Sequence, residues 1–162
     1  MILGNQVEWA IHCMSILGGM PENLTISAKL LAEFHGVPKE YLSKALQSLA
    51  HANLVITTPG PKGGYKLARK PEAITFLEIV EAVEGKQSSF NCQEIRQNNP
   101  CTVKTKKTKS PVCAVASVMY QADNAWREVL RKKTLADLLI DVQKQVPQDI
   151  LTQSQEWFIE KL

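Results

Sequence analysis

The apolar positions in the first part of the chain follow helical spacing in three successive stretches, at residues 3–19, 24–34 and 38–52. Thr25 or Ser27 is placed to cap the second helix, and Pro38 occupies the first position of the third. His35-Gly36-Val37 joins these two helices as a tight turn. Two short helices joined by a short turn that contains glycine are typical of a helix-turn-helix motif.

The next segment predicts a small β-hairpin. Leu54–Thr57 has the composition of a strand, residues 59–64 consist of turn-forming proline and glycine with one lysine, and residues 65–67 form a return strand. A helix-turn-helix followed by a hairpin is a winged helix. The pattern therefore predicts a mainly α fold with a small β-wing.

Helical patterns also dominate the second half of the chain. Thr75 and Glu78 form a capping-box pair at the start of a helix that runs to Val83. A long helix begins at Cys113, with Ser110 as its cap and Pro111 at its first position. Its apolar stripe is too long for any neighbouring segment to cover, which favours a dimerisation helix. Two more helices are predicted, one that starts after Thr134 and one over residues 150–162.

These elements divide the chain into three parts. Residues 1–84 form the winged helix-turn-helix domain, residues 85–111 form a polar loop, and residues 112–162 hold the dimerisation helix and the C-terminal helices. Residues 1–70 carry seven Lys and Arg against four Glu, whereas the other 92 residues balance twelve basic against twelve acidic side chains. The basic excess in the first part favours a polyanion as partner.

Composition excludes several classes of protein. The 162 residues, 44% of them hydrophobic and 22% charged, fit a soluble globular chain. We expect no signal peptide and no membrane span, and therefore a cytoplasmic location. No phosphate-binding loop, dinucleotide-binding glycine motif or nucleophile–base pair is present, so we expect no enzyme.

The loop Phe90–Cys113 contains most of the reactive thiols of the chain. Three of the four cysteines lie in it: Cys92, Cys101 and Cys113. Thiols in a chain of this class favour metal or redox work over structural disulfides. The three loop cysteines leave a four-ligand site one short, so Cys13, His35 or Glu8 would have to complete it. Free thiols without any cofactor remain an alternative.

Several motifs in the correct order resemble the IscR/NsrR/RsrR family of bacterial iron–sulfur winged-helix regulators. They are VPKEYLSKALQSLAHANLV in the third helix, GPKGGYKLAR in the wing, ITFLEIVEAVEG after it and TLADL near the second long helix. The resemblance covers residues 1–142. VEWAIHC and FNCQEIRQ are most similar to the RsrR branch of redox sensors with a [2Fe–2S] cluster.

The RsrR resemblance implies a particular ligand set. Cys92 and Cys113 would bind one iron, and Glu8 and His35 of the partner subunit would bind the other, so that the cluster bridges a homodimer. We prefer His35 because it sits in the turn between two helices, where it is free to project. His12 is its rival, because it lies one helical turn from Glu8. Cys101 would be a spare thiol.

We therefore predict a dimeric transcriptional regulator that senses redox state and changes its affinity for a palindromic double-stranded DNA operator. Two alternatives stay open, a three-cysteine [4Fe–4S] or [2Fe–2S] sensor of nitric oxide or cluster status, and a cluster-free regulator that responds to thiol oxidation or a ligand. The side chains expected at DNA come from the third helix and the wing: Lys39, Tyr41, Ser43, Lys44, Gln47, Thr58, Lys62 and Lys66. The wing reads Thr58-Pro59-Gly60 where the family commonly has a basic residue before the glycine, so base preference or affinity should differ if that position reaches a groove.

Overall fold

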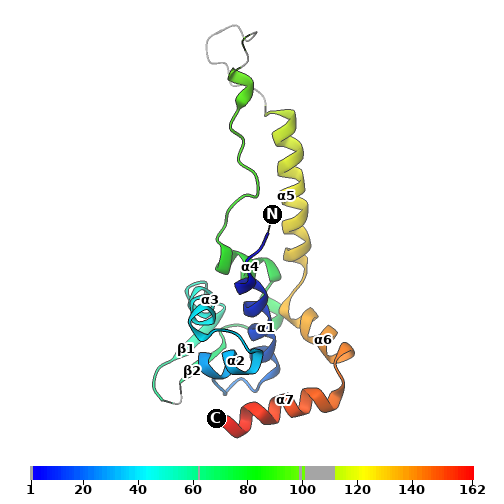
Figure 1. Cartoon of the computed structure of the whole chain (residues 1–162). Coiled ribbons are helices and arrows are strands. Elements are labelled where there is room, and N and C mark those ends of the chain that lie inside the picture. The colour runs from blue at the N-terminus through cyan, green and yellow to red at the C-terminus, as the bar shows by residue number, and fades with distance from the viewer. Residues whose placement is uncertain (1, 62, 99, 101–111) are drawn as a thin grey trace.

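The computed structural model describes residues 2–61, 63–98, 100 and 112–162. These parts contain seven α-helices, two short 3-10 helices and one two-stranded antiparallel sheet (Figure 1). The predicted mainly α fold with a small β-wing is confirmed. The elements are α1 (Asn5–Gly19), α2 (Ala28–His35), α3 (Lys39–His51), β1 (Val55–Thr58), β2 (Gly64–Leu67), η1 (Pro71–Ala73), α4 (Phe76–Glu84), η2 (Ile95–Asn98), α5 (Ala114–Lys132), α6 (Leu135–Gln145) and α7 (Gln148–Lys161).

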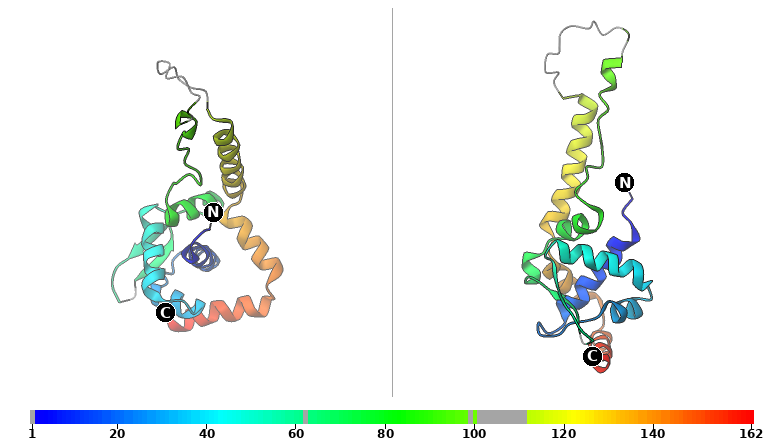
Figure 2. Two further views of the ribbon diagram at one scale, coloured as in Figure 1. Left: turned by 45° about the horizontal axis from the view of Figure 1, so that its top comes forward. Right: turned by 90° about the vertical axis from the view of Figure 1, so that its left-hand side faces the viewer.

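Helix α1 forms the centre of the body. The left view of Figure 2 looks down α1 and shows it surrounded by α2, α3, α4, α6 and α7. Its residues Ala10, Cys13 and Met14 are fully buried, and α3 covers them with Leu42, Leu46 and other apolar side chains. One apolar core therefore joins the helix-turn-helix elements to both C-terminal helices. None of the helices in the described ranges is both long and apolar enough to span a bilayer.

The helix-turn-helix has well-defined ends. The Ser27 hydroxyl accepts a hydrogen bond of 3.2 Å from the amide of Leu30, and Gly36 ends α2 with a φ of 63°, a backbone conformation that favours glycine. The sequence-based start of this helix at residue 24 is wrong by four residues. Pro38, expected at the first helical position, instead precedes α3 as its N-cap residue in extended conformation.

A β-bridge explains why α2 starts late. The Ile26 amide donates to the Tyr65 carbonyl at 3.0 Å, and the Tyr65 amide donates to the Ile26 carbonyl at 2.8 Å. Ile26 is therefore held in extended conformation beside the base of the wing. A Cβ atom on Gly64 would lie 2.4 Å from the Ile26 carbonyl carbon, so the close approach of the two backbones needs glycine at this position.

The wing is the hairpin β1–β2, paired from Val55 opposite Leu67 to Thr58 opposite Gly64. The first strand was predicted one residue too early. Two of the expected caps are confirmed as full capping boxes. Thr75 pairs with Glu78 at the start of α4, and Thr134 pairs with Asp137 at the start of α6.

Helix α5 extends away from the body as an arm, and the segment before η2 runs alongside it (Figure 1; Figure 2, right). The arm joins the body at one corner, where the Phe76 amide donates to the Lys133 carbonyl and the Leu135 amide donates to the Ile74 carbonyl. Cys113 is the N-cap residue of α5, three residues after the cap expected at Ser110, and Ser110 and Pro111 themselves lie outside the described residues. The valines of the predicted apolar stripe are exposed to solvent, and Val115, for example, is 66% exposed.

Helix α7 closes the opposite side of the body. It buries Phe158 completely, and the Phe158 ring lies 4.7 Å from the ring of Phe34 in α2. Polar contacts hold the middle and the end of the helix, because the Gln155 amide donates to the Gly19 carbonyl at 3.0 Å and Lys161 pairs with Glu33 at 2.6 Å. The predicted amphipathic C-terminal helix therefore packs against the first helix of the helix-turn-helix and the end of α1.

The packing of α7 predicts a sharp contrast between two neighbouring positions. Phe158→Ala should lower the free energy of unfolding by about 3–5 kcal/mol, because it opens a cavity beside Phe34. Ile159→Ala, at a side chain that is 55% exposed, should change it by less than about 0.5 kcal/mol. Urea unfolding at equal protein concentration measures both. Equal effects would mean that α7 is not docked on α2.

Candidate functional site

The outer face of α3 is the first candidate site. Leu42, Ala45, Leu46 and Leu49 turn one side of this helix into the core, which leaves the opposite side for solvent. Of the predicted DNA-contacting residues in the described ranges, five are exposed and two are partly buried. The exposed ones are Lys39, Tyr41, Lys44, Gln47 and Thr58, the partly buried ones are Ser43 and Lys66, and Lys62 lies outside the described residues.

Tyr41 and Lys44 form a pair on this face. The Lys44 ammonium group lies 5.7 Å from the centre of the Tyr41 ring, and the ring is 54% exposed. A cation over an aromatic face gains a modest attraction. This contact pre-orders a positive charge and a flat ring with hydroxyl on the surface of a helix, which suits contact with phosphates and base edges.

A second group of chemically active side chains lies at the free end of the arm. Glu94, one of two non-glycine residues with positive φ in the described chain, forms an ion pair with Arg96. Hydrogen bonding to Glu94 raises the pKa of Arg96, and the charges of Cys113 and Cys92 raise it further. Two thiols that the sequence separates by twenty residues therefore both lie within electrostatic range of one guanidinium group.

The Cys113 thiol is primed for ionisation. The nearby backbone amides of Ala116 and Val115 in the first turn of α5, followed by the charge of Arg96, lower the pKa of Cys113. The thiolate is the form that binds metals and attacks oxidants. Cys92 is partly buried nearby, and the third loop cysteine, Cys101, lies outside the described residues.

The histidines form a separate group on the body. The rings of His12 in α1 and His35 in α2 lie 5.7 Å apart, so the structure brings together the two rival nitrogen ligands. Glu8, one turn before His12, is exposed. Glu8 and His12 line the same shallow depression on α1.

The sequence suggested that His35 projects freely from a turn, but in the structure it does not. It is the last residue of α2, it is half-buried, and its ring lies edge-on against Phe34 at 5.2 Å. Desolvation, followed by the nearby charge of His12, lowers the pKa of His35. Its Nε2 atom is buried and makes no hydrogen bond within the described residues. A neutral imidazole with an unused nitrogen is the form in which histidine binds metals.

The cysteine pair and the histidine pair lie in different parts of one chain. The start of α5 is at the tip of the arm, whereas α2 is in the body (Figure 1). Among the described residues, no three His, Cys, Asp or Glu side chains lie close enough together to hold a metal ion. Cys13 is not a candidate, because burial in the core raises its pKa to about 12.

Sequence reasoning missed one residue that links α4, the loop before Cys92 and α5. Arg127 of α5 donates to Asp123 at 3.0 Å, to Glu81 of α4 at 2.6 Å and to the carbonyl of Gln87. The amide of Ser89 donates to Asp123 on the other side. The i,i+4 spacing of Asp123 and Arg127 was visible in the sequence, but Glu81 is 46 residues away and gave no signal. The network fixes α4, the loop and α5 to one another.

The Arg127 network predicts a large stability loss on its removal. Arg127→Met should lower the free energy of unfolding by about 3 kcal/mol, because it leaves Asp123 and Glu81 as facing, poorly solvated carboxylates. Arg131→Met is the matched control on the same helix. Arg131 is 52% exposed and, within the described part of the chain, forms an ion pair with Glu128 alone, so we expect a change below about 0.5 kcal/mol. Comparable losses in urea unfolding would contradict a structural role of the network.

Comparison with known proteins gives these features a context. The sequence profile of the Rrf2 family, described as an iron-dependent transcriptional regulator, matches residues 3–141. The transcriptional regulator NsrR of Geobacillus kaustophilus is 30% identical over 141 residues, which cover 87% of this chain and 91% of that protein.

Solved structures agree with the fold. The structure of IscR from T. potens superposes with a TM-score of 0.68 at 26% identity, and covers 91% of this chain and 93% of that chain. CymR, the global cysteine regulator of B. subtilis, has a TM-score of 0.66 at 24% identity, over 86% of this chain and 96% of that chain. The family profile ends before α7, so the last helix lies beyond the matched region.

Proposed function

Because the chain belongs to the Rrf2 family of DNA-binding transcriptional regulators, we propose that it is a homodimeric redox sensor whose [2Fe–2S] cluster controls its affinity for a palindromic operator. The observation that carries the sensing part is the pair Cys92 and Cys113 within electrostatic range of Arg96, with the Cys113 thiol biased toward thiolate. The description of the family as iron-dependent and the FNCQEIRQ motif support a metal at these thiols.

The DNA-binding step rests on α3 and the wing. A B-DNA major groove admits one α-helix, and α3 presents Lys44 and Gln47 on its exposed face. In a dimer, two such helices read half-sites about one helical turn apart. The bare valine stripe on α5 supports a second copy as the partner of the arm, since an apolar helix face of this length is costly in water.

The residues fit the proposed cofactor by their chemistry. Cys92 and Cys113 would hold one iron as thiolates, and His35 and Glu8 of a second subunit would hold the other. His35 offers a neutral imidazole whose unused Nε2 is buried within its own chain, so its ring would have to turn outward to reach the cluster, and Glu8 offers an exposed carboxylate. The cluster, when bound, supplies a one-electron change of charge. The chain contributes the thiolates, the imidazole and the rigid attachment of both to DNA-reading elements.

Arg127 is suited to transmit a change at the cysteines. The loop that carries Cys92 and the helix that Cys113 caps are both tied to α4 through this side chain. A shift at the tip of the arm therefore acts on the helix that packs directly on α1 and α3. Couplings between two sites of about 1–3 kcal/mol correspond to about 5–150-fold changes in affinity.

A thiol-based sensor without a cluster is the second candidate. The lowered pKa of Cys113 favours it as well, since a thiolate beside Arg96 is also a target for oxidants. The likeness to CymR supports the fold of this alternative only. The remaining alternative is a cluster held by the three loop cysteines, with Cys101 as the third ligand.

Operator binding should depend on α3 in a defined way. Lys44→Ala should weaken binding to every sequence and reduce the slope of log affinity against log salt by about one, because one phosphate contact is lost. Gln47→Ala should relax sequence preference at one base pair, at a cost of about 1–3 kcal/mol. Lys144→Ala on α6, an exposed lysine outside the reading face, is the control and should leave both unchanged. Fluorescence anisotropy over a salt series measures all three.

Metal content separates the cluster from its alternatives. Protein purified without oxygen should be coloured and contain two irons and two sulfides per subunit. Cys92→Ser, Cys113→Ser and His35→Ala should lose most of the cluster, and Cys101→Ser should keep it. His12→Ala is the control for the imidazole ligand and should retain the cluster.

Each alternative has its own outcome in this series. Loss of the cluster from Cys101→Ser with retention by His35→Ala would establish the three-cysteine site instead. Loss of the cluster from His12→Ala but not from His35→Ala would make His12, and not His35, the nitrogen ligand. Colourless, iron-free protein whose operator affinity still responds to diamide would establish the thiol sensor.

A further inference from the structure

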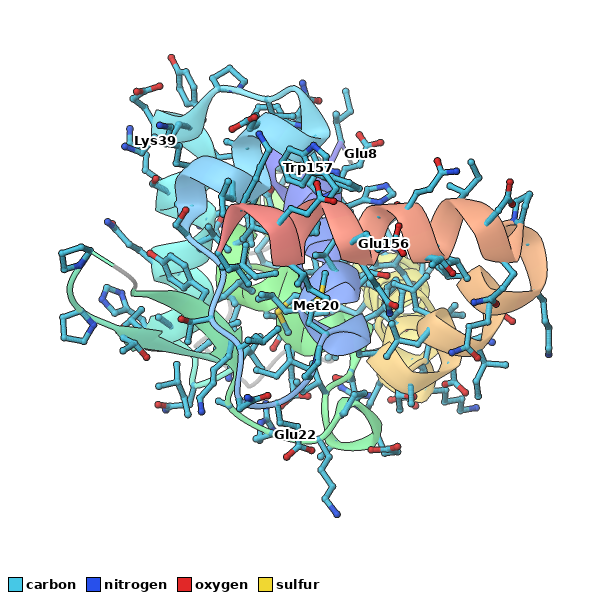
Figure 3. The ribbon with its side chains drawn as sticks, turned by 90° about the horizontal axis from the view of Figure 1, so that it is seen from below. Glu8, Met20, Glu22, Lys39, Glu156 and Trp157 are labelled. Carbon is cyan, nitrogen blue, oxygen red and sulfur yellow. The ribbon has the colours of Figure 1, made fainter. Side chains whose placement is uncertain are left out.

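A small cleft lies where the last helix crosses the body. It has a volume of about 170 Å³, and its walls come from the C-terminal end of α1, from α6 and from α7. In Figure 3, which views the body from below, α7 crosses the foreground and Met20 lies beside it at the end of α1. We call this space the α7 cleft. Residues that line it from α7 include Gln148, Leu151 and Gln155.

About half of the residues that line the cleft follow the region that the family profile matches. The matched region ends at residue 141, whereas Val142, Gln143 and every α7 residue of the wall follow it.

The lining of the cleft specifies the chemistry of an occupant. Its walls are mainly half-buried apolar side chains, and no charged residue is among the lining residues. No lining residue could neutralise the charge of an ion, so the cleft favours an uncharged occupant. The apolar part of the wall is formed by Ile16, Met20, Leu139, Val142 and Leu151.

Three polar groups at the cleft are available for recognition. The Gln155 amide is engaged with the Gly19 carbonyl, and the Ser154 hydroxyl donates to the Ile150 carbonyl at 2.8 Å. By contrast, within the described chain, the hydroxyl of Ser15 and the amides of Gln143 and Gln148 make no hydrogen bond to protein. The cleft therefore offers both donors and acceptors above an apolar floor, the usual layout of a small-molecule site.

We propose that the α7 cleft binds an uncharged one-ring aromatic molecule carrying an amide or hydroxyl group, and that this ligand regulates DNA binding. The volume fits one ring, since an apolar protein cavity of about 150 Å³ accepts benzene. Met20 supplies a thioether, which packs favourably against aromatic rings. The regulatory half of the proposal rests on the proposed function.

The path from the cleft to the DNA-reading elements is short. The first turns of α7 line the cleft, and its last turns hold α2 through Phe158 against Phe34 and Lys161 with Glu33. Figure 3 shows Trp157 on the part of α7 that lies over the body. A ligand that wedges or orders α7 therefore acts on α2, the first helix of the helix-turn-helix.

Benzamide and benzoate provide a matched pair of probes, because they have nearly the same shape and differ in charge. We expect benzamide to bind the full-length holoprotein with a dissociation constant of roughly 1 mM, given its nine heavy atoms, and to shift the methyl NMR signals of Met20 and Leu139. Benzoate should bind at least tenfold more weakly. Equal binding of the two probes, or no shift at either methyl group, would overturn the site.

Two variants test the location, with a control. Leu151→Trp should abolish benzamide binding by filling the cleft, and Gln143→Ala, at an exposed position that tolerates change, should weaken it at least threefold. Ile159→Trp introduces the same ring on the outer face of α7 and should leave binding intact. Undiminished binding to both folded cleft variants would overturn the proposal even if Leu151→Trp alone proved unstable.

The regulatory half is measured separately with labelled operator. Saturating benzamide should change operator affinity at least fivefold in the natural protein and by less than twofold in Gln143→Ala at the same concentration. Unchanged affinity in the natural protein would overturn the regulatory role. Failure to bind any operator without benzamide would instead overturn the proposed function. The two failures can be told apart, because benzamide binding is measured by NMR without DNA.

Discussion

The architecture depends on the ion-pair network around one guanidinium group, that of Arg127. It lies where α4, the loop that leads to Cys92 and the α5 arm meet, and it satisfies one carboxylate from α4 and one from α5. Such partly buried charges stabilise a structure only while every partner is present. The network thus helps to set the direction in which the arm leaves the body, because its hydrogen bonds join α4, the loop and α5 in one fixed geometry.

That direction has a chemical consequence for the candidate sensor. One chain carries thiolate chemistry at the tip of the arm and imidazole chemistry on the body, and these groups do not meet within the described residues. Under the proposed function, a second copy must place its body against the first copy's arm. Sensing, dimerisation and the spacing of the two reading helices then depend on the same rigid joint.

Much of the fold was predictable because its signals are local. The capping box at Thr75 and the glycine turn after α2 act within a few residues of chain, and both were read correctly. The bridge between Ile26 and Tyr65, which shortens α2, joins positions 39 residues apart and leaves no local trace. The half-burial of His35 could not be foreseen either, because it depends on the tertiary packing of α1 and α2. The cysteine ligands remain predictions from motif resemblance.

The same bridge between Ile26 and Tyr65 has a mechanical meaning. It connects the entrance of α2 to the base of the hairpin, and the lack of a side chain at Gly64 lets the two backbones interlock. Wing and helix-turn-helix should therefore move as a single stiff lever. Under the proposed dimer, tolerance for operators with different half-site spacing would then come from bending between the two subunits rather than within one wing and its helix-turn-helix.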